Sequence, residues 1–153
     1  MLRFPLVFGL LLALPLPLAA DTAERRLSAL HLVETAADDA LIRSLAREPV
    51  QELLRASHAR RPALTTPELM ALSALYYEEM HRAALTALRA RAEAIARRYS
   101  AAEIAALRDF AGTAEGAEVL AGHDGITGGL APAIEEAMHA RMDAAFDRYG
   151  RAD

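Results

Sequence analysis

The sequence has no cysteine, no tryptophan and no lysine among its 153 residues. The absence of cysteine excludes disulfide bonds, a thiol nucleophile, a thiolate metal site and a lipid-attached cysteine. Since there are only four tyrosines and four phenylalanines, alanine and leucine must fill most of the core, and such small side chains suit closely packed helices. The five histidines aside, every basic residue is an arginine, and the formal net charge is -4. This balance argues against nucleic-acid binding and against a polybasic membrane anchor.

The first twenty residues have the layout of a secretory signal peptide. Arg3 provides a short positive start, and residues 4–18 form an apolar run that is followed by two alanines and then by Asp21. The run is shorter than the roughly 20 residues of a membrane span, and prolines interrupt it near its end. We therefore predict that residues 1–20 are a signal peptide cleaved after Ala20. The mature protein would be one domain of residues 21–153, periplasmic or secreted and without a stable membrane anchor.

Apolar residues recur at helical spacing through residues 21–153, and alternation typical of strands is missing. We predict an all-α fold, a compact bundle of about five or six helices. Pro49 either breaks the second helix or opens a new turn, and Gly112 is placed to end the fourth in a left-handed conformation. The expected helices cover residues 22–35, 38–58, 68–99, 100–111, 114–120 and 132–149, with loops at Ala59–Thr66 and Gly122–Gly129.

The strongest helix signal follows Thr65. Thr65 and Glu68 form a capping box, and Ser100 and Glu103 form a second one before the next helix. Between them the apolar pattern runs without glycine or proline after the first turn, which predicts one long helix or two nearly continuous ones. Its buried stripe is expected at Met70, Ala74, Tyr77, His81, Ala84, Leu88, Ala92, Ile95 and Tyr99.

The segment YSAAEIAALRDFAGTAEG at 99–116 carries a motif of an aromatic residue, an acidic helix start and a later threonine and glycine. Through this motif the chain resembles the bacterial family called domain of unknown function 2059, over roughly residues 88–146. The resemblance implies an exported, all-helical protein without an established activity, and it carries over no catalytic residue. We expect a structural role for the motif, in which Phe110 is buried, Thr113 caps a helix and Gly116 permits close helix approach. The matching residues are Tyr99, Ser100, Glu103, Leu107, Phe110, Thr113 and Gly116.

Two Glu-x-x-His motifs are the strongest candidates for a functional site, because they could bind a metal ion. Glu78 with His81, and Glu136 with His139, each place a carboxylate and an imidazole on one helix face. Two such helices, with one further glutamate from each of two others, form the di-metal site of ferritin-like bundles. Glu136 lies opposite the apolar stripe expected in the last helix, which is Ile134, Met138 and Met142, and the other glutamates read as surface or capping residues. A solvated polar face with His81 partly buried and hydrogen-bonded is the favoured interpretation, and a metal site is the alternative.

Other patterns have simpler interpretations. His123 and Asp124 in the glycine-rich loop lack the Gly-Lys-Ser/Thr ending of a phosphate loop, so a flexible connector is favoured over an anion site. The adjacent acid pairs at 38–39, 78–79 and 135–136 read as exposed helix faces, and no serine sits in a Gly-x-Ser-x-Gly elbow. An apolar groove between the long helix and the last helix could instead bind a small molecule or lipid. Its expected lining is Tyr76, Tyr77, Leu88, Met138 and Met142.

These observations favour an exported, non-enzymatic helical module that binds an envelope protein or assists envelope homeostasis. The first alternative is an apolar small-molecule or lipid binder that uses the interhelical groove. The second is a metal-binding bundle built on the two Glu-x-x-His motifs. No cofactor is expected, and nucleic acid is not an expected partner.

Overall fold

The structure, a computed structural model, consists of helices joined by short turns in the part of the chain that it describes. It describes residues 17–121 and 129–151, with side chains at 21–120 and 129–151. Within these ranges every element is helical, which confirms the predicted all-α bundle of five or six helices. None of these helices has the length and apolar character needed to cross a membrane. The elements are α1 Pro17–Ala36, α2 Asp39–Arg60, α3 Thr66–Arg98, α4 Ala101–Ala111, α5 Ala114–Ala121, α6 Leu130–Ala145 and a terminal π-helical turn, η1 Phe146–Gly150.

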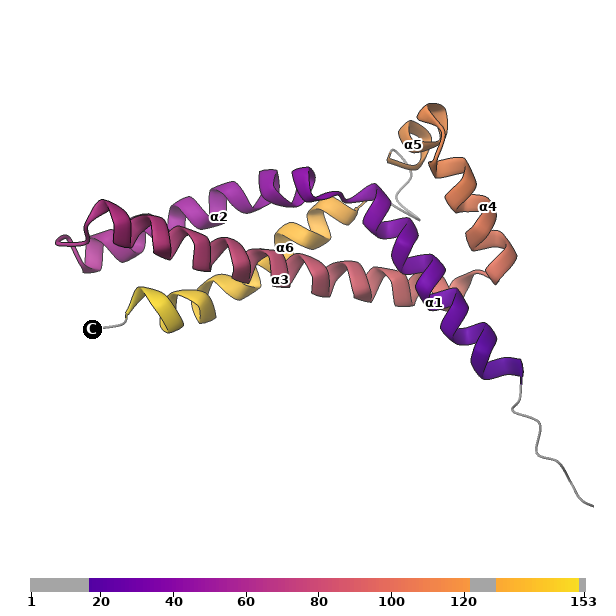
Figure 1. Cartoon of the computed structure of the whole chain (residues 1–153), viewed down its shortest axis with the longest axis horizontal. Coiled ribbons are helices and arrows are strands. Elements are labelled where there is room, and N and C mark those ends of the chain that lie inside the picture. Colours follow the sequence, from indigo (N-terminus) through magenta and orange to yellow (C-terminus); the bar gives the residue numbers. More distant parts are fainter. Residues whose placement is uncertain (1–16, 122–128, 152–153) are drawn as a thin grey trace, which may run out of the picture.

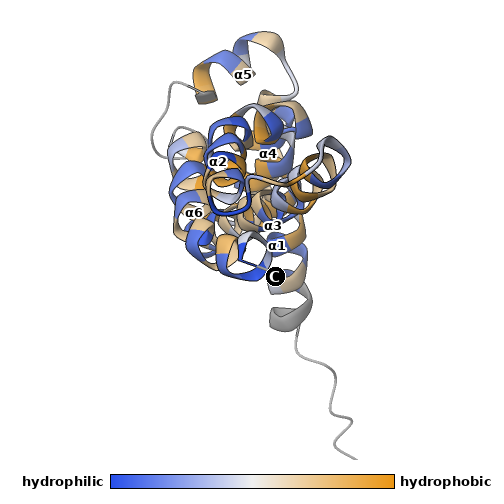
Figure 2. Ribbon diagram, turned by 90° about the vertical axis from the view of Figure 1, so that its left-hand side faces the viewer, coloured by the Kyte–Doolittle hydropathy of each residue, from blue (hydrophilic) through white to orange (hydrophobic). Residues whose placement is uncertain are grey.

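Helix α3 is the central element of the bundle. It has 33 residues, which corresponds to about 50 Å at the usual rise per residue. Helices α2 and α6 lie along it, and α1 crosses it near its C-terminal end (Figure 1). Helix α4 packs on α1, whereas α5 packs mainly on α4 and stands away from the main bundle in both views (Figures 1 and 2).

Small aliphatic side chains form the core, as the composition predicts. Tyr76 is the largest fully buried side chain, and alanines make up much of the rest. Figure 2 looks at the bundle from one side of Figure 1, and there α6 presents a largely hydrophilic outer side. The alanines let α3 lie close to α1, α2 and α6 at once, since they add little bulk between the helix axes.

The helix starts follow the capping signals in the sequence. The Thr65 backbone N–H donates to the Glu68 carboxylate at 2.7 Å, and the Ser100 N–H donates to the Glu103 carboxylate at the same distance. These capping boxes separate α3 from its neighbours, and α3 is one continuous helix. Helix α2 also continues through Pro49, which is buried, so Pro49 neither breaks it nor opens a new turn.

The predicted buried stripe of α3 is correct in its second half and wrong in its first. Ala84, Leu88 and Ile95 are buried, but Met70 is 70% exposed and Ala74 is also exposed. The buried face at the start of α3 runs instead through Leu72 and Tyr76. This face turns toward α2 and η1, and no local pattern specifies those neighbours.

The family-like motif builds the junctions at both ends of α4. The Thr113 hydroxyl accepts from the Gly116 N–H at 3.0 Å, which confirms Thr113 as a cap. A Cβ on Gly116 would lie 1.8 Å from the Phe110 carbonyl oxygen, so the predicted close approach is also confirmed. The predicted burial of Phe110 is wrong, because its side chain is 42% exposed at the end of α4. Gly112 ends α4 with a right-handed φ of -73°, not in the predicted left-handed conformation.

Candidate functional site

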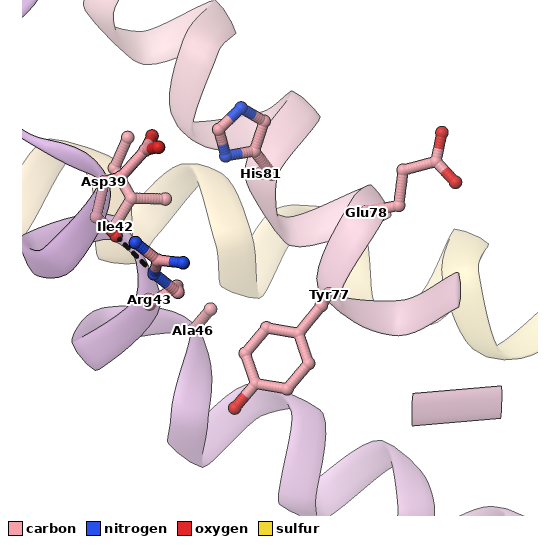
Figure 3. Close-up of a pocket in the computed structure, with 7 residues that line it drawn as sticks. All are labelled: Asp39, Ile42, Arg43, Ala46, Tyr77, Glu78 and His81. Carbon is pink, nitrogen blue, oxygen red and sulfur yellow. Dashed lines mark hydrogen bonds between the residues drawn. The ribbon is translucent and has the colours of Figure 1, made fainter. Parts of the chain in front are cut away.

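A pocket between α2 and α3 brings together acidic, basic, aromatic and aliphatic side chains. Its volume is about 300 Å³. Figure 3 shows side chains of α2 facing Tyr77 and His81 of α3 across the space between the helices, whereas Glu78 points away. The lining residues are Asp39, Ile42, Arg43 and Ala46 from α2 and Tyr77, Glu78 and His81 from α3.

Helical spacing explains why these residues share a pocket. The four α2 residues occur at intervals of three, one and three, which places them on one face of the helix. Asp38 fixes the start of that face, because its carboxylate accepts the Leu41 N–H at 2.8 Å and caps α2. On α3, Tyr77 and His81 are four residues apart and therefore one turn apart on the side that meets α2. The predicted partial burial of His81 is confirmed, but its predicted hydrogen bond is wrong, because no described residue bonds to its ring.

Several polar groups in the pocket have no partner within the described ranges. The Tyr77 hydroxyl, the His81 ring and the Asp39 carboxylate form no hydrogen bond or ion pair there. Arg43 donates its Nε–H to the Asp39 carbonyl oxygen at 3.1 Å, which leaves its terminal N–H groups available. Glu78 differs, because its carboxylate pairs with Arg82 and points away from the other lining side chains (Figure 3).

A second polar centre lies inside the bundle, at Glu79. The residue is 1% exposed, so the prediction that the 78–79 acid pair is an exposed helix face is wrong for Glu79. Its Oε2 accepts from Arg141 Nε at 2.9 Å, and its Oε1 accepts from Arg148 at 2.9 Å and from Arg82 at 3.0 Å. The Tyr149 hydroxyl completes the set at 3.2 Å. Glu79 therefore joins α3 to α6 and η1.

The arginines determine the charge state of Glu79. Burial alone would raise the pKa of its carboxyl group. The hydrogen bond and charge of Arg141, with smaller contributions from Tyr149 and Arg148, outweigh that effect and hold the pKa below its usual value. Glu79 is therefore ionised at neutral pH, and all its lone pairs point at donors. The arrangement is that of a satisfied internal ion cluster, which leaves no vacant position for a ligand.

Aromatic contacts extend this cluster to α2. The Tyr149 ring meets the Tyr76 ring edge-on, with centroids 6.2 Å apart. The hydroxyl groups of Tyr76 and Ser57 lie 2.6 Å apart in the core, and Arg61 donates to the Tyr149 carbonyl oxygen at 3.0 Å. A Cβ on Gly150 would lie 2.4 Å from the Phe146 ring and 2.8 Å from the Tyr76 hydroxyl, so any other residue at position 150 would force these side chains to shift. These contacts fix the π-helical turn against α2 and α3.

The structure does not bring the two Glu-x-x-His motifs together as a metal site. Among residues 17–121 and 129–151, no group of three or more His, Asp or Glu side chains is close enough to hold a metal ion. Glu136 and His139 are exposed, and the His139 ring contacts the Glu135 carbonyl oxygen at 2.8 Å. Glu78 is engaged by Arg82. His123 and Asp124 lie outside the described residues.

The predicted groove between α3 and α6 is wrong in its lining. Tyr76, Leu88 and Met138 are buried core residues, and Met142 packs against the core, so none of them lines a groove. Tyr77 does line a pocket, but it faces α2. A crevice of about 440 Å³ does lie between α3 and α6, where its lining consists of Arg82, Ala83, Thr86, Ala137, Ala140 and Arg141.

Sequence reasoning missed Glu79, although a signal for it exists. Glu79 lies three residues after Tyr76 and one before Met80, on the same buried face of α3. Arg141 and Arg148 are seven residues apart, two helical turns, on the side of the last helix that carries Met138. An acidic residue on a buried helix face, together with two arginines seven residues apart on another helix, is the pattern that indicates the ion cluster around Glu79.

No match to this chain is found among protein-family models, curated proteins or solved structures. The resemblance to domain of unknown function 2059 rests on the motif at 99–116 and stays a prediction.

Proposed function

We propose that this protein is an exported, non-enzymatic binding module and that the α2–α3 pocket is where it takes a small ligand. The observation that carries the proposal is a set of polar side chains without partners around an apolar floor. Asp39, Tyr77 and His81 supply the polar groups, and Ile42 and Ala46 supply the floor. Specific sites for small molecules have this composition, since apolar contacts give affinity and a few polar groups fix orientation.

Export and the absence of catalytic motifs in the sequence support the same role. The layout of residues 1–20 is that of a signal peptide. The sequence has no Gly-x-Ser-x-Gly elbow and no cysteine nucleophile. The Glu79 cluster supports the role indirectly, because it anchors the last turn to α3 and so helps to keep the α2–α3 framework rigid.

NMR spectroscopy of the isotope-labelled protein with a set of small fragments tests the proposal. We expect saturable shift changes centred on Ile42, Tyr77 and His81. Tyr77→Ala should weaken binding, whereas Leu75→Ala on the same helix should not, since Leu75 lies outside this pocket. Circular dichroism checks that both variants keep their helices. Binding that moves other residues would place the site elsewhere, and a failure of every fragment to bind would contradict the binding role.

Helices α4 and α5, here called the α4–α5 arm, carry exposed apolar residues that favour a second candidate function, recognition of an envelope protein. Phe110 and Val119 are large apolar side chains that remain 42% and 56% exposed. Such residues are often buried by partners. Pull-down from envelope extract with the wild-type protein and with a Phe110→Ser, Val119→Ser double variant tests this candidate. A protein captured equally by both forms would rule out the arm as its binding surface.

A further inference from the structure

The charges around the α2–α3 pocket narrow the class of ligand. We propose that the pocket takes a small zwitterion of the size of one amino acid, with a carboxylate, an ammonium group and a compact apolar body. This inference rests on the binding role proposed above, and it adds which chemical groups the ligand carries and which side chains meet them.

The size of the pocket sets the first limit. Its volume of about 300 Å³ lies at the lower end of the range for ligand pockets, roughly 300 to 1,000 Å³. This size favours a compact ligand over a nucleotide or a lipid chain. A molecule on the order of ten non-hydrogen atoms fits the pocket.

Arg43 is the group that would receive the ligand carboxylate. Its Nε–H is held by the Asp39 carbonyl oxygen at 3.1 Å, which orients the guanidinium beside the pocket (Figure 3). It forms no ion pair within the described part of the chain, so its terminal N–H groups can bind a carboxylate. The Tyr77 hydroxyl, on the opposite wall, is a second donor without a partner there.

Asp39 is the group that would receive the ammonium. It lies one helical turn before Arg43, and residues at this spacing have their Cβ atoms about 5–6 Å apart. One wall of the pocket therefore presents a negative and a positive charge side by side, each without an ion-pair partner among the described residues. Glu78 does not compete for the ammonium, because Arg82 neutralises it and it points away (Figure 3).

The floor explains why the ligand carries an apolar body. Ile42 and Ala46 are nearly fully buried and close the pocket between the two charged positions and the core. The half-buried Tyr77 ring faces this floor from α3 (Figure 3). A branched aliphatic side chain would rest on this buried floor and displace water mainly from the half-buried Tyr77 ring, which is favourable in proportion to the apolar area covered.

Titration with L-leucine and two truncated analogues tests the inference. Isoamylamine keeps the ammonium and the apolar body, and 4-methylpentanoate keeps the carboxylate and the apolar body. We expect L-leucine to bind at Ile42 and Tyr77, and each analogue to bind at least about tenfold more weakly, since each loses one charge-assisted contact. Arg43→Gln should weaken L-leucine binding about tenfold and leave isoamylamine unchanged. Arg47→Gln, an exposed arginine on the same helix outside the pocket, is the matched control.

The outcomes separate the ligand class from the binding role. If L-leucine leaves the pocket signals unmoved while another fragment shifts them, the zwitterion is wrong and the binding role stands. Equal affinity for L-leucine and either analogue, or equal affinity in Arg43→Gln and Arg47→Gln, would also overturn the proposed recognition. If no compound binds at the pocket, both proposals fail.

Discussion

Replacing Glu79 by glutamine should destabilise the protein more than any other single removal of a carboxylate. The substitution keeps the shape of the side chain and removes a charge that is 1% exposed and contacted by three arginines. Breaking a buried ion pair from one side costs roughly 3–5 kcal/mol. The arginines are 41% to 54% exposed, and water can therefore solvate them after the change. We expect a loss near the lower end, about 3 kcal/mol.

Urea unfolding followed by far-ultraviolet circular dichroism measures this loss. A change of about 3 kcal/mol corresponds to a fall in Tm on the order of 10 °C for a domain of this size. Glu78→Gln is the matched control, because Glu78 is the neighbouring residue and its only ion pair within the described ranges is an exposed one with Arg82. That control should change the stability by less than about 1 kcal/mol. If the two variants unfold at the same urea concentration, the buried cluster does not stabilise the bundle as we argue.

The pH dependence should follow from the same group. Because the pKa of Glu79 in the folded protein lies below its ordinary value of 4.5, its stabilising contribution is complete above that value and is lost as the pH falls through the folded pKa. The stability gap between wild type and Glu79→Gln should therefore close in acid, which urea unfolding at a series of pH values would check. Gly116→Ala should destabilise the α4–α5 junction by about 1–3 kcal/mol, since the new methyl group would meet a backbone carbonyl at 1.8 Å. Gly112→Ala should change stability by less than about 1 kcal/mol, because the added Cβ would lie 3.4 Å from its nearest neighbouring atom and Gly112 has a right-handed φ. Hydrogen exchange of the α5 amides distinguishes the two variants. Ser57→Ala and Tyr76→Phe should each cost about 1 kcal/mol, and the double variant should cost less than their sum because both remove the same 2.6 Å hydrogen bond. Ser57→Ala should cost the more of the two, since it also removes the bond from the Ser57 hydroxyl to the Leu53 carbonyl oxygen.

Local signals in the sequence predicted most of the helices. The capping boxes at Thr65 and Ser100 and the cap at Thr113 depend on residues three positions apart, so the sequence contains all the information they need. The length of α2 was harder to predict, because tertiary packing around the buried Pro49 outweighs the hydrogen bond that proline removes.

The candidate site could be predicted only in part. The partial burial of His81 followed from its position in the helical repeat. That His81 lies opposite Asp39 and Arg43, however, depends on how α2 packs along α3. The partners of Glu79 are 62 and 69 residues away in the sequence, at Arg141 and Arg148. Periodicity alone cannot indicate which face of α3 meets them, and it therefore assigned the wrong face to the first half of that helix.

Intermolecular nuclear Overhauser effects would report directly whether the proposed α2–α3 pocket holds the ligand. With L-leucine, or with whichever fragment binds, we predict contacts from the ligand protons to the Tyr77 ring and to the Ile42 methyl groups. Contacts confined to another surface, such as the α4–α5 arm at Phe110 and Val119, would contradict this proposal.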